Sequence, residues 1–317
     1  MTTPLEKAAQ AAQHAPSVFN TQPWSWRLAG DTLELRADED RKLGTVDRDG
    51  RLLLLSCGAA LHHARVSLAA HGWSATVERF PEPEVLARVR LGPAVPADPG
   101  AQRLEAAIPR RRTDRRSFGE REVSEAELTR LRQLVEAEGA YLHLVRTDQI
   151  AQLAISAELA GDAELGDPEY RAELDRWTSR PEFAGDGVPR STAVEAGLRR
   201  VPVRDFAPDG EAGLSVGAEH DQGAAYVVLF GEDTRPVDLL RGGEALSALL
   251  LLATADGLAT APISDAIEVE WPRQLVAGLL AGVGEPYLVV RLGYPAAPEP
   301  LPPRPRRDVR DVITIIE

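Results

Sequence analysis

The chain has 317 residues, of which 44% are hydrophobic, and this is enough for a core of about two domains or two halves of one body. Its formal net charge of −13 argues against a nucleic-acid partner, because the phosphates of DNA or RNA would repel it. The single cysteine, Cys57, cannot form an internal disulfide and lies in an apolar run, which favours a buried side chain over a catalytic thiol.

The first hundred residues predict short helices, two strand pairs and one long helix. The Gly30-Asp31 turn between two short strands is a hairpin signal, and apolar residues recur at three- and four-residue steps through the long helix. The expected helices are 4–13 and 50–71, and the expected strands are 27–28, 32–36, 75–79 and 86–91. Residues 92–100, rich in Pro, Gly and Ala, are expected to connect this half to the rest.

The remaining residues alternate helices and apolar strands around one irregular stretch. Ser124 and Glu127 have the spacing of a capping box, which begins a helix. The expected helices are one ending at 108, 124–139, 148–159 and 239–257, and the expected strands are 141–145, 225–230, 287–292 and 309–316. Gly, Pro and Asp recur from 161 to 217, and a long stretch of this kind is usually functional or mobile. The tail 298–307 is proline-rich and predicted to be extended.

Signals for export or membrane insertion are missing from the pattern. Residues 1–13 are acidic and polar and lack the apolar core of a signal peptide. The longest apolar run, 245–255, is shorter than the roughly 20 residues that span a bilayer. We therefore expect a soluble, cytoplasmic protein with no membrane partner.

An arginine-rich segment stands out in this acidic chain. Residues 110–116 hold five arginines, whose forked guanidinium groups donate paired hydrogen bonds to phosphate oxygens, and Thr113 adds a hydroxyl donor. A second basic cluster, at Arg304, Arg306 and Arg307, lies on the stiff tail. An arginine run alone is more often a solvated surface, but the second cluster favours a phosphate site.

A polar turn follows the first helix. Asn20 and Gln22 each present a donor and an acceptor in one plane, which suits the edge of a flat heterocycle, and Pro16 and Ser17 precede them. Ordinary turn chemistry is the competing interpretation.

Motifs for several other chemistries are lacking. The sequence has no HExxH, CxxC or GxSxG pattern and no glycine-rich dinucleotide loop after a strand. His62 and His63 are adjacent and are expected on different sides of a helix, so we predict no metal site.

Two helices share a pattern that suggests duplication of one α/β unit. Residues 57–72 and 242–257 each have a glycine near the start, a glycine at the end and strand-like sequence afterwards. Chance similarity between alanine-rich buried helices is the alternative.

Four segments together resemble the nitroreductase-like flavoprotein family, and within it the Acg-type subfamily. Residues 111–115 are similar to the family's Arg-Arg-Ser-x-Arg phosphate motif, and residues 15–24 to its Ala-Pro-Ser-x-x-Asn-x-Gln-Pro-Trp flavin-edge motif. Residues 257–264 are similar to the segment whose backbone lies along the flavin near N5. Residues 293–306 are similar to the C-terminal strand and basic residues that reach the phosphate.

The resemblance implies an α+β nitroreductase-like fold of two similar halves, residues 1–100 and 101–317, with a lid-like insertion at about 161–217. Ordinary members have the arginine motif before the Ala-Pro-Ser motif, whereas here the order is reversed and each half has one of them. The chain is therefore expected to be a fused pseudo-dimer with one intact FMN site, and so monomeric.

The resemblance also implies a role for each site residue. The residues expected to bind FMN are Pro16, Ser17, Asn20, Gln22, Arg111, Arg112, Thr113, Arg115, Ala261, Pro262, Ile263, Arg304 and Arg306. The arginine segment and the tail would hold the phosphate, the polar turn the ring edge, and residues 261–263 the N5 side. Arg115 would lie near N1 and O2. Because the flavin would carry the chemistry, no catalytic side chain is predicted. Many relatives have an acid near N5, where this chain has Ser264, followed by Asp265.

The leading functional hypothesis is an FMN-dependent oxidoreductase that uses NAD(P)H and a small electron-poor or aromatic substrate, such as a nitro compound or quinone. The alternative is a flavin-sequestering or redox-sensing protein whose lid prevents turnover. An enzyme with a specialised biosynthetic substrate, shaped by the lid, is a third hypothesis.

Overall fold

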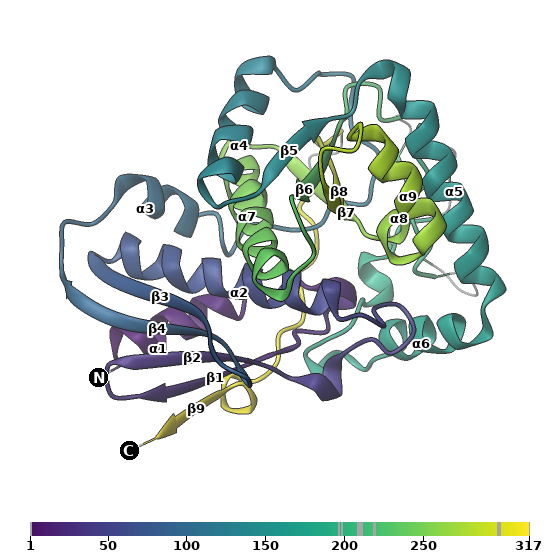
Figure 1. Cartoon of the computed structure of the whole chain (residues 1–317). Coiled ribbons are helices and arrows are strands. Elements are labelled where there is room, and N and C mark those ends of the chain that lie inside the picture. Colours follow the sequence, from purple (N-terminus) through teal and green to yellow (C-terminus); the bar gives the residue numbers. More distant parts are fainter. Residues whose placement is uncertain are drawn as a thin grey trace.

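Two β-sheets and two long helices between them build the protein, as seen in the computed structural model (Figure 1). The structure describes residues 2–195, 197, 199–207, 212–217, 220–296 and 299–316. The helices are α1 (Pro4–Ala12), α2 (Arg51–Ala70), α3 (Pro99–Glu105), α4 (Glu125–Ala137), α5 (Ile150–Gly166), α6 (Pro168–Thr178), α7 (Pro236–Ala255), α8 (Asp265–Glu268) and α9 (Glu270–Leu279). The strands are β1 (Trp24–Ala29), β2 (Thr32–Ala37), β3 (Trp73–Glu82), β4 (Val85–Ala94), β5 (Tyr141–Leu144), β6 (Ala225–Gly231), β7 (Ala259–Ile263), β8 (Glu285–Gly293) and β9 (Ile313–Ile316).

The first sheet joins the two ends of the chain. Its strand order is β3-β4-β2-β1-β9, and the last strand pairs in parallel with β1, with Trp26 opposite Ile313. Figure 1 shows β9 beside β1, at the bottom of the molecule. The C-terminal segment therefore crosses from the second sheet to the first, and the tail before β9 is held at both ends.

The second sheet is antiparallel, with the order β5-β6-β8-β7. Its strands are apolar on both faces because both faces are covered: α4 and α7 pack on one side, and α5, α8 and α9 on the other. On β8, for example, Leu288 and Val290 belong to the hydrophobic cluster that includes α4 and α7, and Val289 belongs to the one that includes α5, α8 and α9. This double burial explains the continuous apolar runs of its strands.

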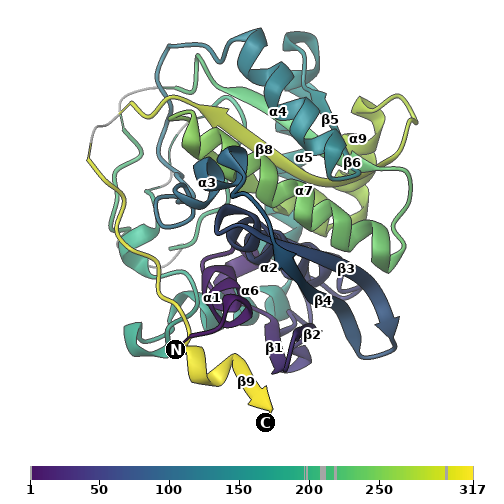
Figure 2. The ribbon, with the colours of Figure 1, turned by 90° about the vertical axis from the view of Figure 1, so that its left-hand side faces the viewer.

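The helices α2 and α7 pack directly on each other between the sheets (Figure 2). The contact is close because glycines face backbone: an added Cβ at Gly58 would overlap the carbonyl oxygen of Leu240, and one at Gly243 that of Leu55. By length and composition α2 could cross a membrane, but most of it is buried inside the protein, as expected of a core helix. Packing between two layers therefore accounts for its apolar sequence.

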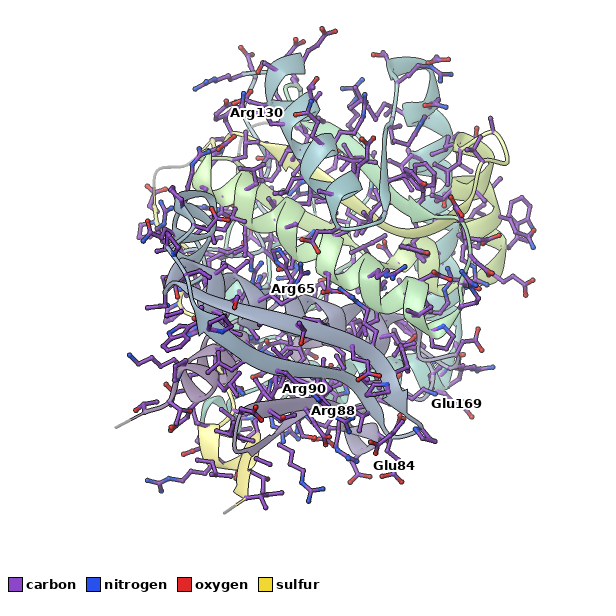
Figure 3. The ribbon with its side chains drawn as sticks, turned by 60° about the vertical axis from the view of Figure 1, so that its left-hand side comes forward. Arg65, Glu84, Arg88, Arg90, Arg130 and Glu169 are labelled. Atoms are coloured by element: carbon purple, nitrogen blue, oxygen red, sulfur yellow. The ribbon has the colours of Figure 1, made fainter. Side chains whose placement is uncertain are left out.

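A buried polar network crosses this helix pair. His62 and His63 both reach the hydroxyl oxygen of Ser247 on α7, through Nδ1 at 2.7 and 2.9 Å, so the prediction that they point to different sides of α2 was wrong. Ser247 lies across from both, and a single hydroxyl can meet two neighbouring imidazoles. Arg65 of α2 (Figure 3) pairs with Glu244 of α7 at 2.7 Å. Among the described residues, no cluster of three or more His, Cys, Asp or Glu could hold a metal ion.

Most of the predicted elements are confirmed, including the Ser124 capping box, but several boundaries differ. The strand predicted at 309–316 covers only Ile313–Ile316, after a short 3-10 turn at Val309–Asp311. The stretch expected to be irregular from 161 contains the end of α5 and all of α6. Gly161 and Gly166 are tolerated in α5 at a cost of about 1 kcal/mol each, and Asp167 then caps α6. The connector predicted at 92–100 begins inside β4 and ends inside α3. Residues 196, 198 and 208–211 of the predicted insertion, and residue 298 of the predicted tail, lie outside the described residues.

The helix crossing gives a stability prediction. Gly58→Ala should lower the free energy of unfolding by about 1–3 kcal/mol, because backbone on α7 cannot move aside for a methyl group. Gly161→Ala is the matched control, since nothing lies within 4 Å of its added Cβ, and it should be neutral or stabilising by up to about 1 kcal/mol. Urea unfolding of the two variants measures both effects, and equal stabilities would contradict the packing described here.

Candidate functional site

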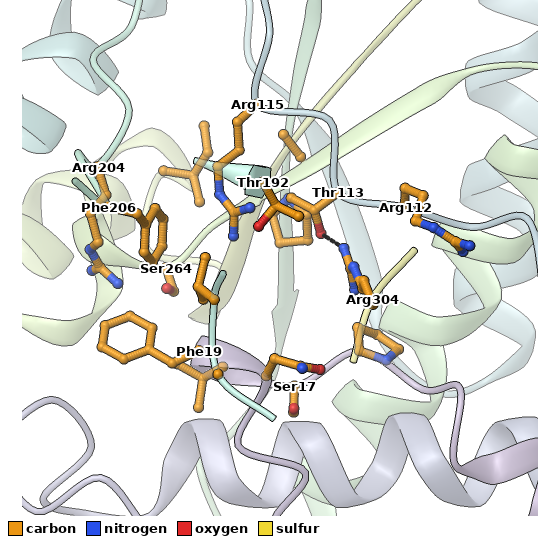
Figure 4. Close-up of a pocket in the computed structure, with 18 of the residues that line it drawn as sticks. Ser17, Phe19, Arg112, Thr113, Arg115, Thr192, Arg204, Phe206, Ser264 and Arg304 are labelled. Atoms are coloured by element: carbon orange, nitrogen blue, oxygen red, sulfur yellow. Dashed lines mark hydrogen bonds between the residues drawn. The ribbon is translucent and has the colours of Figure 1, made fainter. Parts of the chain in front are cut away.

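One large pocket lies where the polar turn, the arginine segment, β7 and the tail meet (Figure 4). It spans a space of ≈ 1210 Å³, part of which is open to solvent. Ten of the thirteen residues predicted to bind the flavin line it: Pro16, Ser17, Asn20, Arg112, Thr113, Arg115, Ala261, Pro262, Ile263 and Arg304. Four segments that are far apart in the sequence therefore form one site.

Backbone contacts fix the arginine segment beside β7. The amide of Asp114 donates to the carbonyl oxygen of Thr260 at 2.9 Å, and Thr113 forms a bridge with the same residue. Arg291 on β8 is fully buried and donates to the carbonyl oxygens of Asp114 and Arg116 at 2.9 and 2.8 Å. Its charge is balanced by Asp221, at 2.6 Å. The segment that carries the pocket arginines is thus attached to the second sheet on two sides.

The arginines at the site form a positive cluster without acidic partners. Among the described residues, none of Arg111, Arg112, Arg115, Arg304 and Arg306 makes an ion pair. Arg111 is 1% exposed, and its three guanidinium nitrogens are buried with no hydrogen-bond partner. Arg304 donates to the hydroxyl of Thr113 in the pocket (Figure 4), and Arg306 donates to Asn20 Oδ1 at 2.6 Å.

Burial and mutual repulsion lower the pKa values of this cluster. Burial, followed by the charge of Arg306, lowers the pKa of Arg111 to about 9, and burial, followed by Arg204, lowers that of Arg115 to about 10. The pKa values of Arg304 and Arg306 are also lowered, chiefly by burial and then by neighbouring arginines. All four pKa values are lowered, which means that the protein alone supplies too little negative charge to stabilise the charged guanidinium groups.

An anion with several acceptor oxygens fits this arrangement. Removing a guanidinium from water costs several kcal/mol unless a counter-charge and hydrogen bonds replace the water. The orphaned nitrogens of Arg111 and the hydroxyl of Thr113 are the donors that a phosphate group accepts. The residues present therefore fit a phosphate monoester on chemical grounds.

The polar turn has an unusual backbone. Phe19, Asn20 and Gln22 have φ angles of 46°, 54° and 51°, a left-handed conformation that non-glycine residues rarely adopt. Ser17 helps to hold the turn, because its Oγ accepts the amide of Gln22 at 2.9 Å, and the amide of Val18 reaches Ser56 Oγ at 3.3 Å. Strained backbone of this kind is concentrated at functional sites.

Gln22 is fully buried and does not line the pocket, in contrast to its predicted place at a ring edge. Its side-chain nitrogen donates to the carbonyl oxygen of Gly185 at 2.8 Å, and its oxygen accepts the amide of Arg307 at 3.1 Å. Gln22 thus joins the turn to the insertion and the tail. Arg111 and Arg306 are the other two predicted residues outside the lining. The charge of Arg111 lowers the pKa of Arg304, which lines the pocket, and the charges of Arg304 and Arg112 lower the pKa of Arg306.

Three further groups at the pocket were not predicted as site residues. The rings of Phe19 and Phe206 meet edge to face at 5.7 Å, and the guanidinium of Arg115 lies 4.3 Å from the Phe206 ring centroid. Asp265 lines the pocket and is 4% exposed, and burial raises its pKa to about 6. The sequence shows Asp265 beside Ser264 and aromatic residues in the insertion, but their positions at the pocket depend on the fold.

Known proteins resemble the chain in sequence over most of its length. No model of a known protein family matches the chain. The chain is 39% identical over 309 residues to a Mycobacterium tuberculosis protein with the provisional name NAD(P)H nitroreductase Rv3131, covering 95% of this chain and 88% of that one. It is 38% identical over 320 residues to Acg of the same organism, also provisionally named an NAD(P)H nitroreductase, covering 99% and 96%. Among solved structures, the FMN-dependent nitroreductase NfnB from Mycobacterium smegmatis in complex with NADPH matches with a TM-score of 0.45 and 18% identity, covering 68% of this chain and 99% of that one.

The uncompensated charge gives a prediction for the ligand-free protein. Arg111→Met keeps an apolar stem but removes one buried positive charge, so it should raise the Tm in phosphate-free buffer. It should also reduce the Tm increase that inorganic phosphate produces, because one phosphate donor is lost. Differential scanning calorimetry with and without phosphate measures both changes. Arg90→Ala, an exposed site on β4 (Figure 3), is the control and should change neither. A wild-type phosphate response in Arg111→Met would contradict the assignment.

Proposed function

The chain belongs to the nitroreductase family, with the Acg and Rv3131 proteins as relatives, and on this premise we propose that it is an FMN-dependent oxidoreductase. The single observation that carries the proposal is the buried arginine cluster at one end of the pocket, which has no acidic side chain paired with it among the described residues. Bound FMN would accept a hydride at N5 from NAD(P)H and pass it to an electron-poor acceptor, such as a nitro compound or a quinone.

The phosphate of FMN would be held by Arg111, Thr113, Arg304 and Arg306, with the backbone of Arg112 helping. The short contact between Arg304 and Thr113 supports this, because both groups already point to one place in the pocket. The orphaned guanidinium of Arg111 supports it as well. A phosphate there would satisfy these donors and neutralise the repulsion among the arginines.

The flavin ring would lie between the polar turn and β7. Pro16, Ser17 and Asn20 line one side of the pocket and residues 261–263 the other. The strand β7 is an edge strand of its sheet, so its backbone is available to a ligand beyond the single bridge to Thr113. Arg115 would lie near N1 and O2, where positive charge stabilises the anionic reduced ring. We assign Gln22 to positioning of the turn instead of to ring binding.

The rest of the pocket suits a flat aromatic substrate. Phe19, Val203 and Phe206 supply an apolar face beside the proposed ring site. Aromatic side chains of this kind stack on or against planar acceptors and exclude water from hydride transfer. This feature supports a small aromatic substrate such as a nitroarene or quinone.

A second function, sequestration of FMN with little turnover, is favoured by the insertion. Residues 187–189, 192, 203, 204 and 206 line the pocket, and Arg204 is ion-paired to Glu164 and Glu268 at 2.9 and 2.6 Å. These contacts hold the insertion against the site. If it stays closed, bulky substrates have no access to the flavin.

We also propose that the chain is a fused pseudo-dimer of two related halves, residues 1–100 and 101–317. Its support is the pair α2 and α7, which are both 20 residues long, meet through Gly58 and Gly243, and each precede a strand. One site between such halves would explain why the chain carries one set of phosphate residues. A monomer in solution is the oligomeric state expected of this arrangement.

The FMN assignment is tested by binding. Arg304→Ala should weaken FMN binding about 10- to 100-fold, since hydrogen bonds to charged groups contribute about 1.5–3 kcal/mol each. Flavin fluorescence quenching measures the Kd, and Arg90→Ala is the control. Unchanged affinity in Arg304→Ala would place the phosphate elsewhere.

Anaerobic titration with NADH and NADPH separates the two functions. The proposed oxidoreductase should lose its oxidised-flavin absorbance on titration with at least one nucleotide, whereas a sequestering protein should keep it. Arg204→Ala, which removes the ion pairs to Glu164 and Glu268, should accelerate reduction if closure limits access. A protein that takes up no FMN would refute both functions.

A further inference from the structure

A second cavity lies behind the wall of the pocket. It spans a space of ≈ 1110 Å³, part of which is open to solvent, between the start of α2, the helices α5 and α6, and the helices α8 and α9. Leu52 lines both cavities. Asp265 and Arg204 line the first cavity, whereas Glu164, Tyr170 and Glu268 line the second. These five side chains therefore lie at the boundary between the two cavities.

The boundary residues are almost completely buried, and Asp265 and Glu268 lie three residues apart on α8. Arg204 bridges Glu164 and Glu268, and the side chains of the two carboxylates are 4% and 2% exposed. One oxygen of Glu268 and the hydroxyl of Tyr170 are buried without a hydrogen-bond partner, and both residues line the second cavity. An unsatisfied carboxylate oxygen in such a place needs a proton or a water molecule.

The charges do not balance if every carboxyl is ionised. Asp265, Glu164 and Glu268 would carry three negative charges against one guanidinium, in a region from which water is largely excluded. Burial raises the pKa of Asp265 to about 6 and raises that of Glu268 as well, and the charge of Glu164 adds to both shifts. Burial raises the pKa of the Tyr170 hydroxyl, which stays neutral. The cluster therefore holds a proton near neutral pH.

Of the three carboxyl groups in the cluster, Asp265 is the one that lines the pocket. The charge of Arg204 helps to lower the pKa of Arg115 on the arginine segment, and Arg273 on α9 donates to the carbonyl oxygen of Ile267 at 3.3 Å. Asp265 makes no ion pair with Arg204 among the described residues, and its Oδ1 accepts only the amide of Ala266, at 2.8 Å. A purely structural cluster would explain the pairs of Arg204 but not a buried carboxyl group that lines the pocket.

We infer that Asp265, Glu268 and Glu164 form a proton-transfer chain that connects the second cavity to the substrate in the pocket. The inference rests on the proposed function. A quinone takes two electrons and one proton as hydride from the reduced flavin, and Asp265 gives the second proton to the quinone oxygen. Glu268 or Glu164 then returns a proton to Asp265 and takes one from water in the second cavity. Each turnover thus leaves the chain with its original proton content.

Two electron acceptors distinguish proton delivery to the substrate from the other steps of the reaction. Benzoquinone needs a proton with its electrons, whereas ferricyanide takes electrons alone. Asp265→Asn and Glu268→Gln should lower kcat with benzoquinone at least about 100-fold, the lower end for a lost general acid, and leave the ferricyanide rate within about twofold. Wild-type kcat with benzoquinone should fall as pH rises above about 6, where Asp265 loses its proton, and Asp265→Asn should flatten this dependence. Glu169→Gln, an exposed carboxyl on α6 (Figure 3), is the control and should match the wild type with both acceptors.

An infrared titration of the FMN-free protein gives a readout independent of activity. The band of a protonated buried carboxyl should disappear with a midpoint near pH 6, and this band should be missing in Asp265→Asn. Equal loss of the benzoquinone and ferricyanide rates would show a structural role and overturn the proton chain. Unchanged benzoquinone rates in both variants would also overturn it. Either result would leave the proposed function intact, whereas failure of the wild-type protein to bind or reduce FMN would refute the proposed function itself.

Discussion

The arginine cluster at the end of the pocket is the feature on which the account of the site depends. Five guanidinium groups converge without an acidic partner among the described residues, and Arg111 is buried with every side-chain nitrogen unsatisfied. Such an arrangement opposes folding unless the structure around it is strongly held, and it becomes favourable when an anion enters. Binding of an anion at the cluster would therefore increase the free energy of unfolding.

The fold supplies the support that this cluster requires. The crossing of α2 and α7 fixes the turn relative to the second sheet, and β9 anchors the tail that carries Arg304 and Arg306. Asn20 and Gln22 then tie the turn to that tail and to the insertion. Four segments from both ends and the middle of the chain meet because each is attached to a rigid element, and the pocket geometry follows from those attachments.

Sequence patterns predicted the elements and the convergence of the site better than its detailed contacts. Periodicity placed α2, an apolar run placed α7, the Ser124 capping box placed α4, and the family motifs named ten residues that line the pocket. The direction of Gln22 was missed because it depends on strained backbone in the turn, which residue types do not reveal. The pairing of Arg204 with Glu164 and Glu268 was missed because these residues are 40 and 64 positions apart and meet only through tertiary packing.

The most direct test of the central claim compares FMN with riboflavin, which has the same ring and no phosphate. If the arginine cluster is a phosphate site, isothermal titration calorimetry should show FMN binding at least about 100-fold more tightly, equivalent to about 2.7 kcal/mol. This preference should shrink as salt screens the arginine–phosphate attraction. Equal affinities for FMN and riboflavin would contradict the account, because the buried arginines would then have another purpose.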